Sequence, residues 1–502
     1  MMEIHWSLQA SFPMLATLQL LPLLAMTAVL LLRDARHLVA LGGAGALLEL
    51  GLAVELYRRF DPVQPAMQFA EWGKLPGGFG YHAAADGVTV LFVLLTALIT
   101  LLVAVYGPVR GLKPTHRFLA VVFAIESTLM SMFVSLDLLW FTLISALQLG
   151  LVGYLLWRWA TSLDKEPALT RFYQFMGTAI ALLLVGTLML GWSHADATGG
   201  HWTFDLFDLA KVPVSPALQS LVFFLLFCGL AIRTPLFPLH GWLPLVAEHG
   251  NIAVAPTLLL GLKVGIYGML RFVFPLIPEA VLTWHRFVVG FAVVGIFYAA
   301  LLAMMQQNLR RLLAFAVVSH TGLVVIGLFS LSREALQGSV ILSVTFGLAV
   351  ASLLFTTGLI YRRTNTTLLP KLGGLFDQIP VIGGAFLVAS LAIVCMPGTP
   401  GFDAAHLVLE AAIERFGALL SIAATLGNVA AAGVLLWAFQ RAFLARPPEG
   451  IPLRAVERAT APELLVTGLV LAVLLGAGFY SEPWLALIEQ PLKGLGDLYE
   501  PH

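Results

Sequence analysis

Residues 87–106 read GVTVLFVLLTALITLLVAVY, a run of 20 residues without a charged side chain. A helix of about 20 apolar residues is long enough to span the hydrocarbon core of a bilayer. Similar runs recur along the chain, and most charged residues lie in short strips between them. The sequence therefore predicts an all-α polytopic membrane protein.

The composition agrees with this prediction. Of 502 residues, 59% are apolar and only 11% are Asp, Glu, Lys or Arg, whereas an average soluble domain has about 25% charged residues. Acidic and basic residues balance, with 28 of each. These figures exclude a disordered chain, a disulfide scaffold and a basic nucleic-acid binder. Cys228 and Cys395 lie in apolar segments and are interpreted as buried small side chains, and no Cys/His spacing indicates a metal site.

Apolar runs predict about 14 transmembrane helices. Their expected ranges are 13–32, 38–56, 87–106, 118–136, 138–157, 172–191, 218–238, 252–275, 287–305, 311–331, 338–360, 380–396 with an extension to 414, 417–444 and 461–480. Leu136-Asp137-Leu138 leaves room only for a tight turn between two of them. No strand signal is apparent.

Basic residues indicate the orientation of the spans. Most of the 28 lysine and arginine residues, among them Arg110, Arg171 and Arg362, lie in one set of alternate connections. The positive-inside rule places these connections in the cytoplasm. Both termini are therefore expected on the non-cytoplasmic side of a bacterial inner membrane, in agreement with an even number of spans.

Proline interrupts spans 7 and 12, at Pro235 and Pro238 in the first and at Pro397 and Pro400 in the second. Proline frees backbone groups that lipid cannot satisfy, so such breaks persist only where protein or water covers them. The breaks are five spans apart, so the two helices point in opposite directions. This favours two inverted five-helix repeats around an ion path, although kinked packing helices would give the same pattern.

This organisation divides the chain into four parts. Residues 1–117 hold three transmembrane helices and a loop, and residues 446–502 hold a C-terminal helix and tail. The two predicted repeats, 118–275 and 276–445, lie between them.

Ionisable residues inside spans are rare and mark functional sites by default. Glu126 can be a proton carrier or the partner of a buried cation. Lys263 can exchange protons once burial favours its neutral form, or it can be structural. Arg233 can anchor an anion but not relay a proton. His320 can pass protons or simply pack.

Other ionisable residues are expected nearer to water. Asp403, His406 and Glu410 follow the second break and can line a re-entrant loop. Glu49 and Glu55 lie nearer a span end, so a solvated or subunit-contact role is expected for them.

Four stretches of the sequence carry a family resemblance. They are Tyr81-His82-Ala83-Ala84-Ala85-Asp86-Gly87-Val88, Arg233-Thr234-Pro235-Leu236-Phe237-Pro238-Leu239-His240-Gly241-Trp242-Leu243-Pro244, Leu309-Arg310-Arg311-Leu312-Leu313-Ala314-Phe315 continuing to Ser319-His320-Thr321-Gly322, and Pro397-Gly398-Thr399-Pro400-Gly401-Phe402. These motifs resemble those of the antiporter-like membrane subunits of respiratory complex I and of related hydrogenase and Mrp-type complexes, above all chain M of NADH-quinone oxidoreductases. The resemblance covers about residues 79–445.

The resemblance implies a midplane row of buried carboxylate, lysine and histidine residues that moves protons. At the matching positions this sequence has Ala146 for a glutamate, Arg233 for a lysine, Lys263 for a lysine, Phe346 for a histidine, and Ala405 for a glutamate. Because Arg233 lacks the usual carboxylate, we expect Glu126 to be its partner. A subunit with weak or lost proton conduction is predicted.

Three functions remain open. The first is a membrane-arm subunit of an NADH-quinone oxidoreductase type complex, not catalytic alone. The second is an Mrp-type cation/proton antiporter subunit, and the third belongs to an inorganic-carbon uptake complex with a zinc carbonic-anhydrase-like partner. Each implies other membrane subunits and the bilayer as partners, and no cofactor on this chain, with quinone left to the assembled complex.

Overall fold

The structure is a computed structural model that describes residues 2–32, 35–74, 80–162, 164–251, 257–258, 263–399, 401–446 and 457–500. Within these residues, eleven helices are long and apolar enough to cross a membrane. They are α2 (Met14–Leu31), α3 (Ala35–Arg59), α4 (Gly87–Arg110), α5 (Thr115–Val134), α6 (Leu138–Arg158), α7 (Glu166–Ala197), α9 (Pro216–Arg233), α14 (Pro278–Met304), α15 (Leu309–Ser330), α16 (Arg333–Thr364) and α19 (Ala418–Phe439).

Shorter elements complete the described chain. Apolar segments Val264–Leu276, Pro380–Ile393 and Ala461–Gly476 coincide with predicted spans 8, 12 and 14. The remaining bounds are α1 (Trp6–Gln9), α8 (Leu206–Lys211), α10 (Leu243–His249), α12 (Val264–Gly268), the π-helical turn η1 (Met269–Val273), α13 (Phe274–Leu276), η2 (Leu369–Lys371), η3 (Leu375–Asp377), α17 (Pro380–Ile393), α18 (Gly401–Phe416), η4 (Gln440–Leu444), α20 (Ala461–Phe479) and α21 (Glu482–Gly496). The prediction of a helical multispanning protein is confirmed.

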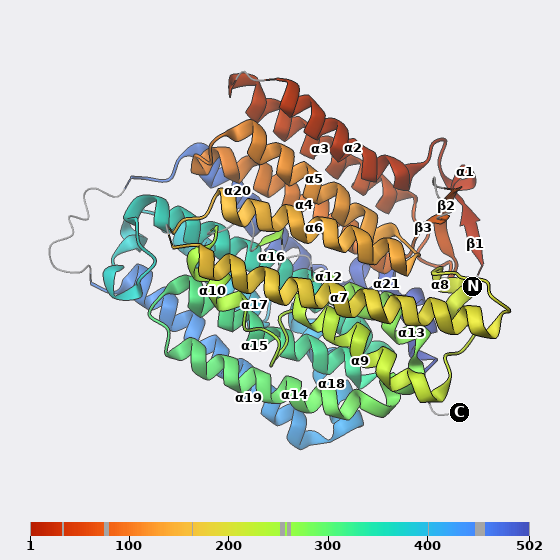
Figure 1. The fold of residues 1–502 in the computed structure, drawn as a ribbon. Helices are drawn as coiled ribbons and strands as arrows, with labels where there is room; N and C mark the ends of the chain where they lie inside the picture. The colour runs from red at the N-terminus through yellow and green to blue at the C-terminus, as the bar shows by residue number, and fades with distance from the viewer. Residues whose placement is uncertain are drawn as a thin grey trace.

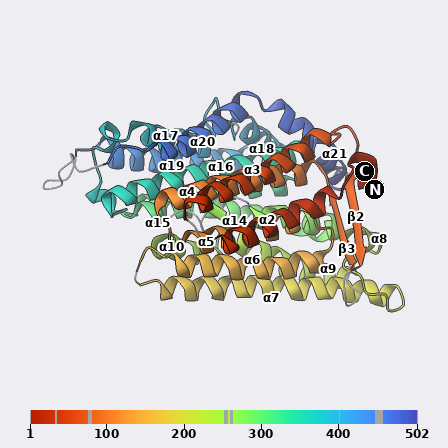
Figure 2. The same cartoon turned by 90° about the horizontal axis from the view of Figure 1, so that it is seen from above.

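The long helices lie roughly side by side (Figures 1 and 2). The middle of the bundle is formed by α15 and α16, which are almost wholly buried, whereas α2, α3 and α19 expose much of their length. A helix that is apolar on every side packs in the interior or faces lipid. Helix α16 contacts α4, α15, α17, α18 and α21, and so joins the N-terminal and C-terminal parts of the chain.

Both predicted helix breaks are present. Helix α9 ends at Arg233, directly before Thr234 and Pro235, and α10 resumes at Leu243. Helix α17 ends at Ile393 and α18 begins at Gly401, with Pro397 between them. Proline disfavours the helical conformation of the residue before it, which explains why α9 does not continue through Thr234. Pro400 and residues 259–262 of span 8 lie outside the described residues, and the inverted repeats remain a prediction.

A small sheet caps one end of the bundle, contrary to the expectation of no strands. It has the order β1-β2-β3, formed by Glu3–His5, Met67–Lys74 and Gly80–Ala85. β1 runs parallel to β2, and β2 runs antiparallel to β3 with Trp72 opposite His82. These strands are short and β1 joins from far away in sequence, so local periodicity does not reveal the sheet. The N-terminal strand and α21 lie at this same end (Figure 1).

Helix α21 closes that end against α4 and α16. A Cβ atom on Gly87, the first residue of α4, would lie 1.8 Å from the carbonyl oxygen of Leu487. Only glycine permits this backbone approach. The tail predicted after residue 480 is therefore a helix packed on the start of α4.

Candidate functional site: buried ionisable residues

Arg233, the last residue of α9, is held by neutral side chains of α6. It is 7% exposed, and its Nη1 donates to Ser145 Oγ at 2.5 Å while Nη2 donates to Gln148 Oε1 at 2.9 Å. The predicted ion pair with Glu126 is wrong, because both carboxylate oxygens of Glu126 lack a hydrogen-bonding partner among the described residues. The sequence suggested an opposite charge as the partner of Arg233, whereas the partners are the neutral acceptors Ser145 and Gln148 of α6.

Lys263 lies where α12 begins and is 3% exposed. Its Nζ donates to Thr321 Oγ1 of α15 at 2.8 Å. Its backbone has φ 43° and ψ 40°, in the left-handed region that a residue other than glycine adopts only where its surroundings enforce it. The lysine therefore lies at an interruption of span 8 and contacts a neutral hydroxyl.

His320 precedes Thr321 on α15 and is 3% exposed. Its Nε2 has no hydrogen-bonding partner among the described residues, and its ring centroid lies 5.5 Å from that of Phe346. The sequence thus correctly located a lysine and a histidine in the interior, on neighbouring elements. The structure adds that an apolar ring lies beside the histidine.

The two alanines at matched family positions have different surroundings. Ala405 on α18 is buried and packs in the apolar core. Ala146 is only half-buried, whereas its neighbour Ser145 reaches Arg233. Neither methyl group can take or release a proton.

His240 lies in the turn between α9 and α10 and is 6% exposed. Its Nδ1 has no hydrogen-bonding partner among the described residues. Phe237 and Tyr298 flank its ring, with centroids 5.9 and 5.6 Å away. The first helix break therefore holds an imidazole in largely aromatic surroundings.

Asp403, His406 and Glu410 lie on one exposed face of α18 rather than along a re-entrant loop. Ser481 donates a hydrogen bond to Asp403 at 2.8 Å. His406 Nε2 lies 3.2 Å from Glu410 Oε1, with side chains 69% and 61% exposed. The structure therefore places them on the flank of the bundle, away from Lys263 and Arg233.

The solvated role expected for Glu49 is wrong. Glu49 is 1% exposed and its carboxylate oxygens have no hydrogen-bonding partner among the described residues. Glu55 instead pairs with Arg58 at 3.0 Å and with Arg59 at 2.7 Å. Distance from the span end did not distinguish the two, because burial depends on which helix covers each face.

A buried ion pair at the sheet-capped end was not foreseen. Arg271 Nη2 lies 2.7 Å from Asp86 Oδ1, and both residues are 8% exposed. Asp86 also caps α4 by accepting from the backbone N–H of Thr89 at 2.9 Å. Burial opposes ionisation of Asp86, but the charge and hydrogen bond of Arg271, together with the hydrogen bonds from Thr89, outweigh it and lower the pKa of that carboxyl. The N-cap position of Asp86, just before span 3, was the available signal.

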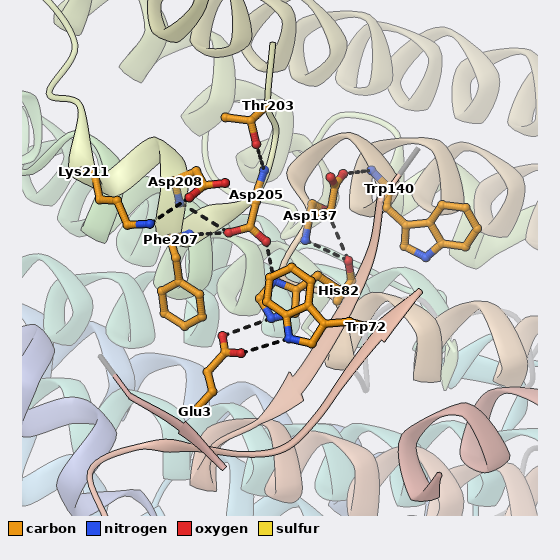
Figure 3. Close-up of polar contacts among 11 residues, drawn as sticks. Glu3, Trp72, His82, Asp137, Trp140, Thr203, Asp205, Phe207, Asp208 and Lys211 are labelled. Carbon is orange, nitrogen blue, oxygen red and sulfur yellow. Dashed lines mark hydrogen bonds and ion pairs between the residues drawn. The ribbon is translucent and has the colours of Figure 1, made fainter. Parts of the chain in front are cut away.

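A second polar cluster lies nearby and joins three distant segments (Figure 3). His82 of β3 hydrogen-bonds through Nδ1 to Asp205, while its Nε2 lies 3.0 Å from Glu3 Oε1. The Trp72 ring stacks on the imidazole with centroids 3.4 Å apart. Asp205 also accepts from the backbone N–H of Phe207 at 2.9 Å. The cluster therefore connects β1, β2, β3 and α8.

At the opposite end, Glu463 of α20 binds two arginines of α16. Glu463 Oε1 lies 3.2 Å from Arg362 Nη1, and Oε2 lies 2.6 Å from Arg363 Nη2. Glu463 is 1% exposed and also caps its own helix through the backbone N–H of Thr460. Among the described residues, no group of three or more His, Cys, Asp or Glu side chains has an arrangement that could hold a metal ion.

Together, the broken helices and the interior Lys263, His320 and Arg233 define a multispanning membrane protein with ionisable groups along its middle. The profile of the NADH:quinone oxidoreductase/Mrp antiporter transmembrane family matches residues 135–430. The chain belongs to this family.

Individual proteins agree. NADH-quinone oxidoreductase subunit M of Pseudomonas aeruginosa is 32% identical over 428 residues, covering 83% of this chain and 82% of the relative. A chain of respiratory complex I from Thermus thermophilus is 27% identical, with a TM-score of 0.84, and the match covers 97% of this chain and all of that one. A chain of the Mrp complex from Dietzia shares the fold at 18% identity, with a TM-score of 0.84.

Proposed function

We propose that this chain is a membrane-arm subunit of an NADH:quinone oxidoreductase type complex, that it binds no redox cofactor itself, and that it conducts protons poorly or not at all. The named relatives support the first part of the proposal. The basic connections and the shared end of the two termini favour a bacterial inner membrane with both termini on the non-cytoplasmic side.

The interior of the bundle supports weak conduction. A relay needs neighbouring groups that take and release protons within hydrogen-bond reach or through water. Arg233 contacts a hydroxyl and an amide, and a guanidinium does not release its proton in proteins. Beside His320, the Phe346 ring supplies no proton acceptor. A proton path through Lys263 is therefore interrupted on one side at Arg233 and on the other side at Phe346.

Proton flux into liposomes tests this proposal. The purified chain, reconstituted with an entrapped pH dye, should show flux close to that of protein-free vesicles, and Lys263→Ala should leave it unchanged. The gain-of-function variant Phe346→His with Ala146→Glu tests the gaps directly. Brisk flux in the natural chain that Lys263→Ala abolishes would contradict weak conduction.

The exposed face of α18 supports a neighbouring membrane subunit as a partner. Asp403, His406 and Glu410 lie on a helix of a predicted span, where each charged group facing lipid would cost about 2.5–3.5 kcal/mol. A polar or basic helix of another subunit would remove that cost. We expect His406→Cys to cross-link to a neighbour in native membranes, whereas Leu301→Cys, on an exposed apolar face of α14, should not.

Purification of the tagged chain from native membranes identifies the complex. Flavin and iron–sulfur subunits should accompany it. Recovery of small multi-cation antiporter subunits would instead indicate an Mrp-type antiporter. Recovery of a zinc protein would indicate the inorganic-carbon uptake assembly.

A further inference from the structure

Two buried glutamates outside the Lys263 region lack partners. Glu49 on α3 is 1% exposed and Glu126 on α5 is 0% exposed. Among the described residues, none of their four carboxylate oxygens has a hydrogen-bonding partner. Such buried groups are rare, because a buried carboxylate without a partner is strongly destabilised.

The packing of α3 on α5 brings the two side chains to one level. A Cβ atom on Gly42 would lie 2.8 Å from Leu119 Cδ1, and one on Gly45 would lie 3.4 Å from Phe123. One helical turn beyond Gly45 on α3 lies Glu49, and one turn beyond Phe123 on α5 lies Glu126. Both residues continue the faces by which the two helices pack. Helices α2, α3, α4 and α5 lie together in the red and orange part of Figure 1.

Among the side chains that the structure describes, the surroundings of the pair contain a further unsatisfied group but no neutralising cation. Thr100 of α4 lies next to Glu126. The charge that acts electrostatically on the Glu126 carboxyl is that of Glu49. The Thr100 hydroxyl is itself buried and has no hydrogen-bonding partner among the described residues. Polar groups from α3, α4 and α5 therefore lie near one another without satisfying one another's hydrogen-bonding capacity.

On the helices packed against α5, the charged side chains that the structure describes are engaged elsewhere or distant. Helix α2 carries none. On α3, Arg58 and Arg59 bind Glu55, and His37 lies at the start. The other basic residues lie at helix ends, two or more turns away: Arg110 on α4, His116 and Arg117 on α5, and Arg158 on α6. In β3, His82 binds Glu3 and Asp205.

Two neighbouring carboxylates in an apolar interior cannot both ionise without a cation, so at least one of them binds a proton. We propose that Glu49 and Glu126 form a proton-binding site that holds at least one proton at neutral pH, separate from the region of Lys263 and His320. This site does not depend on whether the chain conducts protons. Because the groups interact, they titrate as a coupled pair.

Infrared spectroscopy of the full chain in lipid vesicles tests the site, since a protonated carboxyl has a C=O stretch that a carboxylate lacks. The difference between the natural chain and the Glu49→Gln, Glu126→Gln double variant at neutral pH should contain this band. In Glu49→Gln alone, the remaining Glu126 band should titrate at lower pH, because the like charge is removed. Glu55→Gln, on the same helix but ion-paired, is the control and should leave the band unchanged.

Three results would overturn the proposal. A flat difference spectrum for the double variant would show that neither carboxyl is protonated. An identical Glu126 titration with and without Glu49 would show two independent acids. Loss of the band when sodium ions are added, with no change in pH, would assign the pair to a metal cation instead. Since glutamine is isosteric and removes buried charge, the variants should fold, and circular dichroism verifies this.

Discussion

Buried ionisable residues have different partners at the two ends of the bundle and in its middle. At the ends, two buried acids bind arginines: Asp86 binds Arg271, and Glu463 binds Arg362 and Arg363. In the middle, Arg233 and Lys263 contact only neutral side chains among the hydrogen bonds found, and Glu126 has no partner among the described residues. Paired charges fix geometry, whereas Lys263 and Glu126, which are not ion-paired among the described residues, remain able to change protonation. The ion pairs at the ends therefore stabilise the fold like clamps, whereas the groups that can still bind and release protons lie in the middle.

The largest expected effect is at an end. Asp86→Asn leaves Arg271 buried without its carboxylate, and removing one partner of a buried pair costs about 3–5 kcal/mol. Thermal or denaturant unfolding in detergent micelles measures this loss. Asp208→Asn, which breaks an exposed pair with Lys211, is the control. Equal effects of both variants would show that the ends are not clamps.

The same pair predicts a pH dependence. The pKa of Asp86 is lowered in the folded state, so its contribution is fully present above the unfolded pKa and is lost as pH falls through the folded value. The stability difference between the natural chain and Asp86→Asn should therefore shrink in acid. A difference that stays constant from neutral to strongly acidic pH would contradict this.

The next effect is in the middle. Gln148→Ala leaves Arg233 with Ser145 alone, and loss of a buried hydrogen bond to a charged group costs about 1–3 kcal/mol. Unfolding of this variant is compared with that of Leu147→Ala, whose side chain is 54% exposed. If Gln148→Ala proves as harmless as Leu147→Ala, Arg233 must have another partner when the protein is in a membrane.

A more local effect is expected at the cluster of Figure 3. His82→Gln cannot bond both Glu3 and Asp205, and a single lost hydrogen bond costs about 1 kcal/mol. Amide hydrogen exchange should speed up in β1 and at the start of α8, while α15 remains protected. His201→Gln, at an exposed position outside the sheet, is the control. Uniform acceleration throughout the chain would mean that the cluster supports the whole fold.

The smallest effect is expected on α18. His406→Ala breaks a pair whose side chains are mostly exposed, and exposed pairs contribute about 0–1 kcal/mol. The isolated chain should unfold almost as before, but the variant should co-purify less well with neighbouring subunits. A large loss of stability in the isolated chain would assign these residues to the fold rather than to an interface.

The helices were predictable from the sequence because span length, proline breaks and the burial of Lys263 and His320 are local or one-dimensional properties. The interaction partners of the buried ionisable residues were not predictable from the sequence. Arg233 was expected to require an acid, yet Ser145 and Gln148 satisfy it. Glu49 resembles Glu55 in sequence, but the packing of α5 covers only the former. The strand β1 pairs with a segment more than 60 residues away, a distance at which periodicity carries no information.

The contact between Gly87 and Leu487 has a consequence for biogenesis. A chain is synthesised from its N-terminus, so α4 enters the membrane long before α21 exists. Until α21 arrives, the cavity of about 120 Å³ that borders Asp86, Arg271, Leu492 and Leu495 lacks one wall. Helix α21 thus completes this wall only after all the segments between α4 and α21 have been made. A chain cut short before residue 482 would leave that wall open.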